Sequence, residues 1–367
     1  MLSPSIFDSE MMARALTLAA RGRYTTMPNP RVGCVLVNDN EIVGEGWHQL
    51  AGEPHAEINA LVEAGDKAAG ATAYITLEPC SHHGRTPPCA EALIKAQIAR
   101  VVYGMQDPNP QVSGQGLEKL RTASIEVDGP LMEAQAQQLN RGFIKRQQQG
   151  LPWVTVKLAM SLDGRTAMAS GESQWITGAA ARSDVQRLRA GSCAMITGIG
   201  TVLKDDPSLT VRAEELGLDE ADKIAARQPL KVVVDSRLQT PPTAKMFKAG
   251  GDVLVAAAQA NGSIADVEVV VLPNDKGQVD LAALLKLLAD RECNEVLVEA
   301  GATLAGAFLQ AGLVDELVVY MAPILLGSDA RSLLDLPLQK MAQQVPLKII
   351  DMRAIGDDWR ITARPER

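Results

Sequence analysis

The spacing of apolar residues changes repeatedly over the first 150 positions of the chain. A spacing of three and four residues, typical of amphipathic helices, occurs over 8–23, 55–65, 87–97 and 116–123. Short apolar runs bounded by turn residues predict strands over 31–37, 41–47, 72–77 and 100–105. We expect Asp8 or Ser9 to cap the first helix and the Gln-rich stretch 130–150 to form one further helix. These elements predict a small three-layer α/β domain.

A second alternation of strands and helices begins near residue 151. A strand-like run over 153–160 follows Leu151-Pro152, so we divide the chain into domains 1–148 and 149–367; the alternative is a loop inside a single domain. Further helices are expected over 179–190, 280–290 and 302–311, and further strands over 193–197, 231–235, 253–257, 267–272, 295–299 and 316–321. The apolar stretches 347–352 and 358–363 are expected to form a closing antiparallel pair.

Charge and composition narrow the choice of partners. The 367 residues include 36 Lys and Arg against 44 Asp and Glu, and aromatic residues make up only 3%. An acidic chain with few aromatic side chains lacks the basic surface and the stacking platforms of nucleic-acid-binding proteins. No uncharged apolar run is long enough to span a membrane, and the first residues lack the cationic start of a secretory signal. We therefore expect a cytoplasmic protein that binds neither nucleic acid nor membrane.

The histidines and cysteines are unevenly distributed. All four histidines lie between His48 and His83, and the five cysteines are Cys34, Cys80, Cys89, Cys193 and Cys293. An odd number of cysteines in a long chain without a signal peptide argues against a disulfide framework. We interpret Cys34, Cys193 and Cys293 as buried core residues and His48 as structural.

The remaining histidines and cysteines suggest a catalytic zinc site. His55, Cys80 and Cys89 supply one imidazole and two thiolates, and each lies at or near the start of an expected helix, which favours the thiolate form. Glu57 follows two residues after His55, is not needed as a ligand, and could pass the proton of an activated water to a departing amine. The pattern His-x-Glu followed by Pro-Cys-x-x-Cys is that of zinc deaminases acting on heterocyclic amines.

The spacing departs from that pattern, because the second thiol comes nine residues after Cys80 and not three. Cys89 could be the third ligand, His82 or His83 could replace it, or both cysteines could be ordinary core residues. A structural zinc site is a further alternative, although such sites usually have four protein ligands. The loop from His82 to Thr86 is suited to contact a phosphate or sugar, or it is a solvated basic loop.

The second half of the chain gives weaker signals. Gly198-Ile199-Gly200 and the strand–turn–helix pattern over 299–306 could each hold a phosphate at a helix start, or could be packing glycines. Neither is a complete dinucleotide fingerprint. This half has no histidine and a single tyrosine, Tyr320, so a general acid there must be a carboxylate, a lysine or water. That composition suits a dihydrofolate-reductase-like site, in which hydride reaches an imine-type carbon.

Several motifs resemble the bifunctional riboflavin-biosynthesis deaminase/reductase family. They lie at 26–34, 52–57, 77–89 and 107–110 in the first half and at 157–165, 173–177, 187–190, 200–212, 234–236 and 298–301 in the second. The spaced loop from Pro79-Cys80 to Pro88-Cys89 separates this family from other cytidine-deaminase-like enzymes. The resemblance covers nearly the whole chain. It implies an α/β protein with an N-terminal cytidine-deaminase-like three-layer α/β/α domain and a C-terminal dihydrofolate-reductase-like α/β domain.

The resemblance also implies two consecutive activities, those of a hydrolase and an oxidoreductase. The first is zinc-dependent hydrolytic deamination of 2,5-diamino-6-(5-phosphoribosylamino)pyrimidin-4-one, with Zn2+ on His55, Cys80 and Cys89 and with Glu57 as the catalytic proton shuttle. Asn29, His82 and Arg85 would border this substrate. The second is NADPH-dependent reduction of the ribosyl group to ribityl.

The reductase residues carried over from the family fall into two sets. Those expected to bind NADPH are Ala159, Trp175, Thr201, Asp205, Ser236, Gly301, Ala302, Thr303, Leu304, Ala305, Gly306 and Ala307. Those expected to contact the phosphoribosyl substrate are Ser173, Arg189, Leu209, Arg212 and Glu299. Arg189 and Arg212 could grip a phosphate as a pair, whereas each alone would be interpreted as a solvated charge. Asp205 or Glu299 would orient the ribose hydroxyls or supply a proton.

Some properties follow from the resemblance alone. Members of the family associate, so a homo-oligomer, dimer or tetramer, is expected. Residue chemistry does not distinguish NADPH from NADH, although Arg237 beside Ser236 could meet a 2′-phosphate. Two other hypotheses are a nucleobase or tRNA-editing zinc deaminase with a non-catalytic second domain, and a non-enzymatic scaffold held together by zinc.

Overall fold

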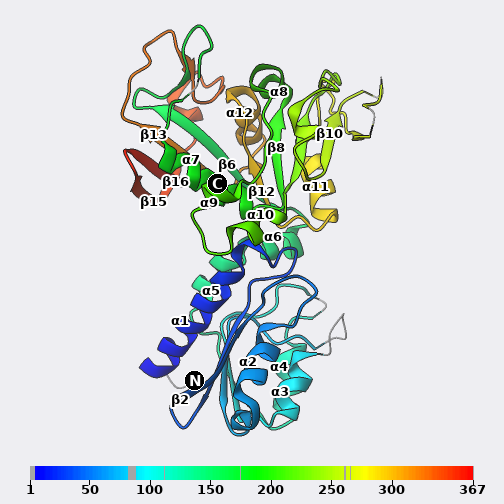
Figure 1. The fold of residues 1–367 in the computed structure, drawn as a ribbon, viewed down its shortest axis with the longest axis vertical. Coiled ribbons are helices and arrows are strands. Elements are labelled where there is room, and N and C mark those ends of the chain that lie inside the picture. The colour runs from blue at the N-terminus through cyan, green and yellow to red at the C-terminus, as the bar shows by residue number, and fades with distance from the viewer. Residues whose placement is uncertain are drawn as a thin grey trace. The chain divides into compact units, whose positions relative to one another are not determined.

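The protein is described here by a computed structural model that covers residues 5–81, 88–110, 112–173, 175–259, 262–264 and 266–366 (Figure 1). The chain forms two compact units, Met1–Gly150 and Leu151–Arg367. Each unit is built around its own sheet. Among the described residues, none of the helices combines the length and hydropathy that a membrane-crossing segment requires.

The first unit contains a five-stranded sheet in the order β2-β1-β3-β4-β5. Its strands are β1 (Gly33–Asn38), β2 (Glu41–Trp47), β3 (Thr72–Ile75), β4 (Arg100–Tyr103) and β5 (Glu126–Asp128). β1 is antiparallel to β2 and β3, whereas β3, β4 and β5 are parallel to one another. Its helices are α1 (Ile6–Arg21), α2 (Ala56–Ala64), α3 (Cys89–Lys95), α4 (Gln115–Thr122), α5 (Glu133–Leu139) and α6 (Arg141–Gln149).

Successive residues of β1 face opposite sides of this sheet, and helices cover both sides. Val35 and Val37 pack against Met12 and other residues of α1, whereas Cys34 and Leu36 pack in the cluster that contains residues of α2, α3 and α4. Figure 1 shows α1 on one side of the sheet and α2, α3 and α4 on the other. The predicted three-layer α/β arrangement is therefore confirmed.

The close approach of α2 to the sheet fixes the position of His55 at its first turn. Ala56, Ala60 and Ala64 are buried and lie four residues apart, so they form one face of the helix. That face contacts β2 at Gly44 and Gly46, where an added Cβ would overlap backbone atoms of α2. Small residues on both elements therefore let the helix lie directly on the strand.

The second unit contains a nine-stranded sheet in the order β11-β10-β9-β8-β12-β6-β13-β16-β15. These strands are β6 (Trp153–Ser161), β8 (Ala194–Gly198), β9 (Leu230–Val234), β10 (Val253–Ala257), β11 (Glu268–Val271), β12 (Glu295–Val298), β13 (Glu316–Ala322), β15 (Leu347–Ile355) and β16 (Asp358–Pro365). The strands from β11 to β13 are parallel, and the predicted antiparallel pair β15–β16 closes the sheet beside β13. β7 (Arg165–Ala167) and β14 (Arg331–Ser332) form a separate two-stranded sheet.

Helices cover both faces of the central strands in this unit. α11 (Leu281–Asp290) and α12 (Ala302–Gln310) pack on one face through Leu284, Leu288 and Phe308. α7 (Ala179–Ala190) packs on the other through Ala181 and Val185, which contact Val318 and Tyr320 of β13. The remaining helices are α8 (Ile199–Asp205), α9 (Ala213–Leu216) and α10 (Ala221–Ala226). The predicted α/β class is confirmed for this unit too.

Three sequence-based expectations about local structure were wrong. The first helix begins earlier than expected: Ser5 is its N-cap, and Asp8 accepts the backbone N–H of Ser5 in a capping box. The stretch 130–150 forms two helices, because the buried side chain of Asn140 leaves the helix and binds the backbone of Arg31 at 2.8 and 2.9 Å. Cys80 lies in a segment without regular secondary structure after β3, so of the two cysteines Cys89 alone begins a helix.

Candidate active sites

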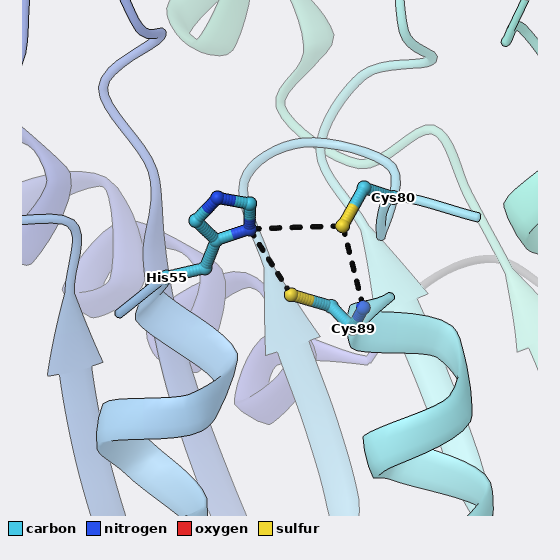
Figure 2. A group of neighbouring side chains, drawn as sticks. All are labelled: His55, Cys80 and Cys89. Carbon is cyan, nitrogen blue, oxygen red and sulfur yellow. Dashed lines mark hydrogen bonds between the residues drawn. The ribbon is translucent and has the colours of Figure 1, made fainter. Parts of the chain in front are cut away.

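Three side chains that are far apart in the sequence meet at the end of the first sheet. His55 is the N-cap of α2, Cys80 follows β3, and Cys89 is the first residue of α3. Their ligand atoms all lie within 4.8 Å of one another. His55 Nδ1 is 3.2 Å from Cys89 Sγ and 3.6 Å from Cys80 Sγ, and the backbone N–H of Cys89 donates to Cys80 Sγ at 3.3 Å (Figure 2). The structure therefore brings together the three predicted zinc ligands.

Burial and hydrogen bonding prepare this cluster for a cation. A hydrogen bond from the Cys89 thiol lowers the pKa of Cys80 to about 4, so Cys80 becomes a thiolate readily, whereas the same contact and burial raise the pKa of Cys89. Glu57 lies on the first turn of α2, is 4% exposed, and its carboxylate contacts the Cys89 thiol. Burial raises the pKa of Glu57 to about 7. A buried acid thus lies beside the cluster without being one of the three ligands.

The donor set fits zinc. One imidazole nitrogen and two sulfurs are the ligand types that Zn2+ prefers, and three protein ligands leave a position for water. Figure 2 shows the three ligand atoms pointing toward one another. His82, His83 and Arg85 lie outside the described residues, so their predicted roles stay predictions.

His48 connects two parts of the candidate deaminase site. The sequence did not reveal this connection. It is 2% exposed, its Nδ1 is 3.2 Å from the carbonyl oxygen of Pro54, and its Nε2 is 3.0 Å from the side-chain nitrogen of Asn29. Because a carbonyl can only accept, Nδ1 carries the proton and Nε2 accepts from Asn29. His48 therefore ties the predicted substrate residue Asn29 to the segment that presents His55.

Glu78 supports the segment that carries Cys80. It is 3% exposed, and its carboxylate accepts from the backbone N–H groups of Asp107, Gly114 and Gly116 at 3.1, 2.9 and 3.0 Å. A Cβ on Gly116 would overlap the carbonyl oxygen of Pro79, so the first turn of α4 lies directly against this segment. Glu78 directly follows the apolar run 72–77, and this position was the sequence signal that could have revealed its supporting role.

The predicted reductase residues gather at one edge of the second sheet. Thr201 follows β8, Ser236 follows β9, and Glu299 and Gly301 follow β12. Because these three strands are parallel, their carboxyl ends meet at the same edge, where ligands bind in open α/β sheets. Gly301 is the N-cap of α12, so the backbone N–H groups of Ala302 and Thr303 are at the start of a helix.

A buried ion pair occupies this edge. The guanidinium of Arg189 makes two hydrogen bonds to Glu299, at 2.6 and 3.0 Å, and the two side chains are 14% and 10% exposed. Arg212, the other arginine expected to grip phosphate, pairs with Glu215 at 2.8 Å. Burial opposes ionisation of Glu299, but the charges of Arg189, Lys157 and Arg212 lower its pKa below the usual value. The structure thus places three predicted substrate residues within electrostatic reach of one another.

Lys157 is a residue whose role the sequence reasoning missed. It lies in β6, where burial lowers its pKa and the nearby carboxylate of Glu299 opposes that shift. A lysine inside the apolar run 153–160 was the available signal, because a charged residue is rarely placed in a central strand without a partner. Lys157 adds an ammonium group beside Glu299 in a unit that has no histidine.

The other predicted residues vary in exposure. Trp175 is 70% exposed, and the guanidinium of Arg182 lies 4.8 Å from its ring centroid. Leu209 is buried with a positive φ of 49°, and Asp205 is exposed at the last position of α8. Ala159 lies in β6, Ser173 is partly buried, and residues 302–307 are the first six residues of α12. The side-chain oxygen of Ser236 accepts the backbone N–H of Val279 at 3.2 Å.

Two family models match the chain, one for each unit. Residues 5–105 match the family described as the cytidine and deoxycytidylate deaminase zinc-binding region. Residues 152–361 match the RibD C-terminal domain.

Proteins of similar sequence extend the likeness over the whole length. "Riboflavin biosynthesis protein RibD" of Escherichia coli is 55% identical over 96% of this chain and 97% of its own length. The protein of the same name from Haemophilus influenzae is 50% identical over 100% of both chains.

Solved structures show the same likeness. RibD of Acinetobacter baumannii, form 1, is 48% identical, has a TM-score of 0.92, and covers 98% of this chain and 99% of its own. A Thermotoga maritima structure is described as a diaminohydroxyphosphoribosylaminopyrimidine deaminase/5-amino-6-(5-phosphoribosylamino)uracil reductase. It is 33% identical, has a TM-score of 0.87, and covers 98% of this chain and 99% of its own.

Proposed function

The chain belongs to the RibD family of bifunctional deaminase/reductases of riboflavin biosynthesis, and we propose here how its two activities are distributed. Membership confirms the sequence-based predictions of the family, of the two-part α/β fold, and of a hydrolase joined to an oxidoreductase. It also excludes a scaffold without activity and an editing deaminase with a non-catalytic second domain. We assign the deaminase to residues 1–148 and the reductase to residues 149–367.

In the deaminase we propose that His55, Cys80 and Cys89 hold Zn2+, and that the substrate is the diaminopyrimidinone for which the Thermotoga relative is named. When bound, zinc activates water for attack on the amine-bearing carbon. Glu57 accepts the proton of that water and donates it to the departing ammonia, because its carboxylate lies beside the ligand cluster and is shielded from solvent. Asn29, His82 and Arg85 contact the pyrimidine and its phosphoribosyl group.

In the reductase we propose that NADPH binds along the carboxyl edge of the second sheet and supplies the hydride that converts the ribosyl group to ribityl. The N–H groups at the start of α12 hold a cofactor phosphate, and Ala159, Trp175, Thr201, Asp205 and Ser236 complete the cofactor site. Ser173, Arg189, Leu209, Arg212 and Glu299 contact the substrate. Glu299 orients the ribose hydroxyls, because Arg189 keeps it ionised and therefore a hydrogen-bond acceptor.

We further propose that the protein is a homo-oligomer in solution.

The convergence of His55, Cys80 and Cys89 beside the buried Glu57 is the observation on which the proposed deaminase depends most.

The substitution Glu57→Gln tests that proposal. It keeps the size of the side chain but removes the proton-carrying group, so we expect ammonia release to fall by about 100-fold or more. Zinc content, measured by metal analysis, and oxidation of NADPH with the deaminated intermediate should stay at the wild-type level. Glu53→Gln, an exposed acid on the same segment, is the matched control and should leave all three measurements unchanged. Normal ammonia release from the Glu57→Gln variant would contradict the assigned role.

A further inference from the structure

Cys193 and Cys293 lie side by side at the amino ends of two neighbouring strands of the second sheet. Cys193 directly precedes β8 and Cys293 comes two residues before β12, and the two strands are parallel neighbours (Figure 1). The backbone N–H of Cys193 donates to the carbonyl oxygen of Glu295 in β12 at 2.8 Å. The two thiols hydrogen-bond each other. Two cysteines that are far apart in the sequence thus bring their sulfur atoms together.

The surroundings of Cys193 favour its thiolate form. The hydrogen bond from the Cys293 thiol and the positive charge of Arg227 lower the pKa of Cys193 to about 6, although burial opposes this shift. The backbone N–H of Asn294 also donates to the sulfur of Cys193, at 3.2 Å. At neutral pH this side chain therefore carries the negative charge that makes a cysteine nucleophilic.

Arg227 gives independent evidence for an anion at this position. It follows α10, and its Nη2 donates to the carbonyl oxygen of Ser192, the residue before Cys193, at 3.4 Å. Its Nη1 is buried and has no hydrogen-bond partner within the described part of the chain. A buried cationic nitrogen is costly unless an opposite charge lies nearby. The thiolate of Cys193 supplies that charge.

The two thiols differ in accessibility. Cys193 is partly exposed, so its interpretation as a buried core residue was wrong, whereas Cys293 is buried as expected. An accessible thiolate beside a second thiol is the usual arrangement of a redox-sensitive pair, in which the second thiol resolves the oxidised first one. Cys34 provides the contrast, because it is fully buried and burial raises its pKa well above the usual value.

We propose that Cys193 and Cys293 form a redox-modification site, which hydrogen peroxide converts into a reversible disulfide. The Cys193 thiolate attacks one peroxide oxygen: an S–O bond forms, the O–O bond breaks, and the departing hydroxide takes up a proton to leave as water. The Cys293 thiol then attacks the sulfur of this sulfenic acid. An S–S bond forms, the S–O bond breaks, and the hydroxide leaves as water with the proton of Cys293. Each sulfur gives up one electron, and the peroxide accepts two.

The site is separate from both enzymatic activities. Its thiols lie at the opposite ends of β8 and β12 from Thr201 and Gly301, which follow the carboxyl ends of these strands. The disulfide connects residues about a hundred positions apart, so it restricts the unfolded chain and stabilises the second unit. The inference therefore holds whether or not the residues of the two candidate active sites are assigned correctly.

Peptide mapping by mass spectrometry tests the proposal. The zinc-loaded wild type is treated with a small excess of hydrogen peroxide, its remaining thiols are alkylated, and the protein is digested. We expect a pair of peptides linked through Cys193 and Cys293, about 2 Da lighter than the two reduced peptides together, which dithiothreitol separates. Cys34 in the same digest is the internal control and should stay reduced.

Two variants separate the roles of the two thiols. Cys293→Ala should leave Cys193 as a sulfenic acid, which dimedone traps, whereas Cys193→Ala should leave Cys293 reduced. A cooperative thermal unfolding transition verifies that each variant is folded. If Cys193→Ala does not fold, Cys193→Ser replaces it.

A third variant tests the contribution of Arg227. Arg227→Gln should slow the alkylation of Cys193 by iodoacetamide at neutral pH by about 3-fold or more, because less of the thiol is ionised. Lys223→Gln is the matched control, since Lys223 is an exposed cation of α10, and it should leave the rate unchanged. Equal rates for Arg227→Gln and the wild type would contradict the role assigned to Arg227.

The wild-type digest decides the proposal even if no variant folds. Cys193 that is oxidised no faster than Cys34 would overturn the site altogether. Cys193 that is oxidised without becoming linked to Cys293 would overturn the disulfide. A linked pair that forms faster than any oxidation of Cys34, and that dithiothreitol reverses, would support both.

Discussion

At the scale of single residues, the candidate reductase site contains a carboxylate that its neighbours keep charged. Glu299 is held by two hydrogen bonds from Arg189, and Lys157 lies close enough to affect its pKa. Ion pairs as buried as this one lose most of their hydration, so each partner depends on the other. Removing one charge leaves the other buried without an opposite charge beside it.

We expect Glu299→Gln to lower the free energy of unfolding by about 3–5 kcal/mol at neutral pH, because it leaves Arg189 unpaired. The loss should shrink in acid. A carboxyl whose pKa is lowered by folding stabilises the fold above its unfolded pKa, close to 4.5, and this contribution disappears as the pH falls through the lower folded pKa. Urea unfolding of wild type and variant, at neutral pH and in acid below the folded pKa, measures the difference.

The exposed pair of Glu268 and Arg291 provides a control in the same unit. Its side chains are 51% and 34% exposed, so Glu268→Gln should change the free energy of unfolding by less than about 1 kcal/mol. A loss for Glu299→Gln that stays constant from neutral to acid would show that the carboxylate is not ionised in the native state.

At the scale of elements, the boundary between α5 and α6 depends on one side chain. Asn140 is 2% exposed and both accepts from and donates to the backbone of Arg31, at 2.8 and 2.9 Å. The two hydrogen bonds connect the end of α5 to the segment that precedes β1. They satisfy both the backbone N–H and the backbone carbonyl of Arg31.

Asn140→Ala should lower the free energy of unfolding of the first unit by about 2 kcal/mol or more, because two buried backbone groups lose their partners. Thermal unfolding followed by circular dichroism measures the change. Asn38→Ala is the matched control: its side chain also donates twice, to Lys67 and Ala69, but at an exposed position where water can replace it. Equal decreases in the free energy of unfolding for the two variants would show that burial does not determine how much stability is lost.

Periodicity was enough to predict most of the regular elements. It located helices such as α2, α7 and α12 and strands such as β6 and β13 within a few residues, because their apolar faces are continuous. It failed where a tertiary contact decides the local structure. Nothing in the Gln-rich run 130–150 indicates that Asn140 binds Arg31, which is more than a hundred positions earlier. Short elements such as β5, β7 and α8 have too few residues to show a period.

The candidate zinc ligands were predictable because zinc requires particular side chains, and His55, Cys80 and Cys89 are rare residue types in a recognisable order. The supporting residues were harder to predict. His48 and Glu78 act through hydrogen bonds to backbone groups of Pro54 and Gly116, and backbone partners leave no pattern in the sequence. Residue type therefore predicts a ligand, whereas only coordinates reveal what positions it.

At the scale of the whole molecule, each unit carries the residues of one candidate site. His55, Glu57, Cys80 and Cys89 all come from the unit Met1–Gly150, and Arg189, Ser236, Glu299 and Gly301 all come from Leu151–Arg367. The two family models divide in the same way, over 5–105 and 152–361. Loss of metal should therefore affect the two activities unequally.

We expect Cys89→Ala to abolish both zinc content and ammonia release while NADPH oxidation with the deaminated intermediate stays at the wild-type level, since the reductase residues lie in the other unit. Treating the wild type with a chelator should have the same effect and should also lower the unfolding temperature of the first unit, because zinc binding is coupled to folding. Cys293→Ala, a buried cysteine of the second unit, is the matched control and should retain zinc and ammonia release. Reduction that disappeared together with zinc would mean that the reductase depends on the metal site, and would contradict the proposed division of the two activities.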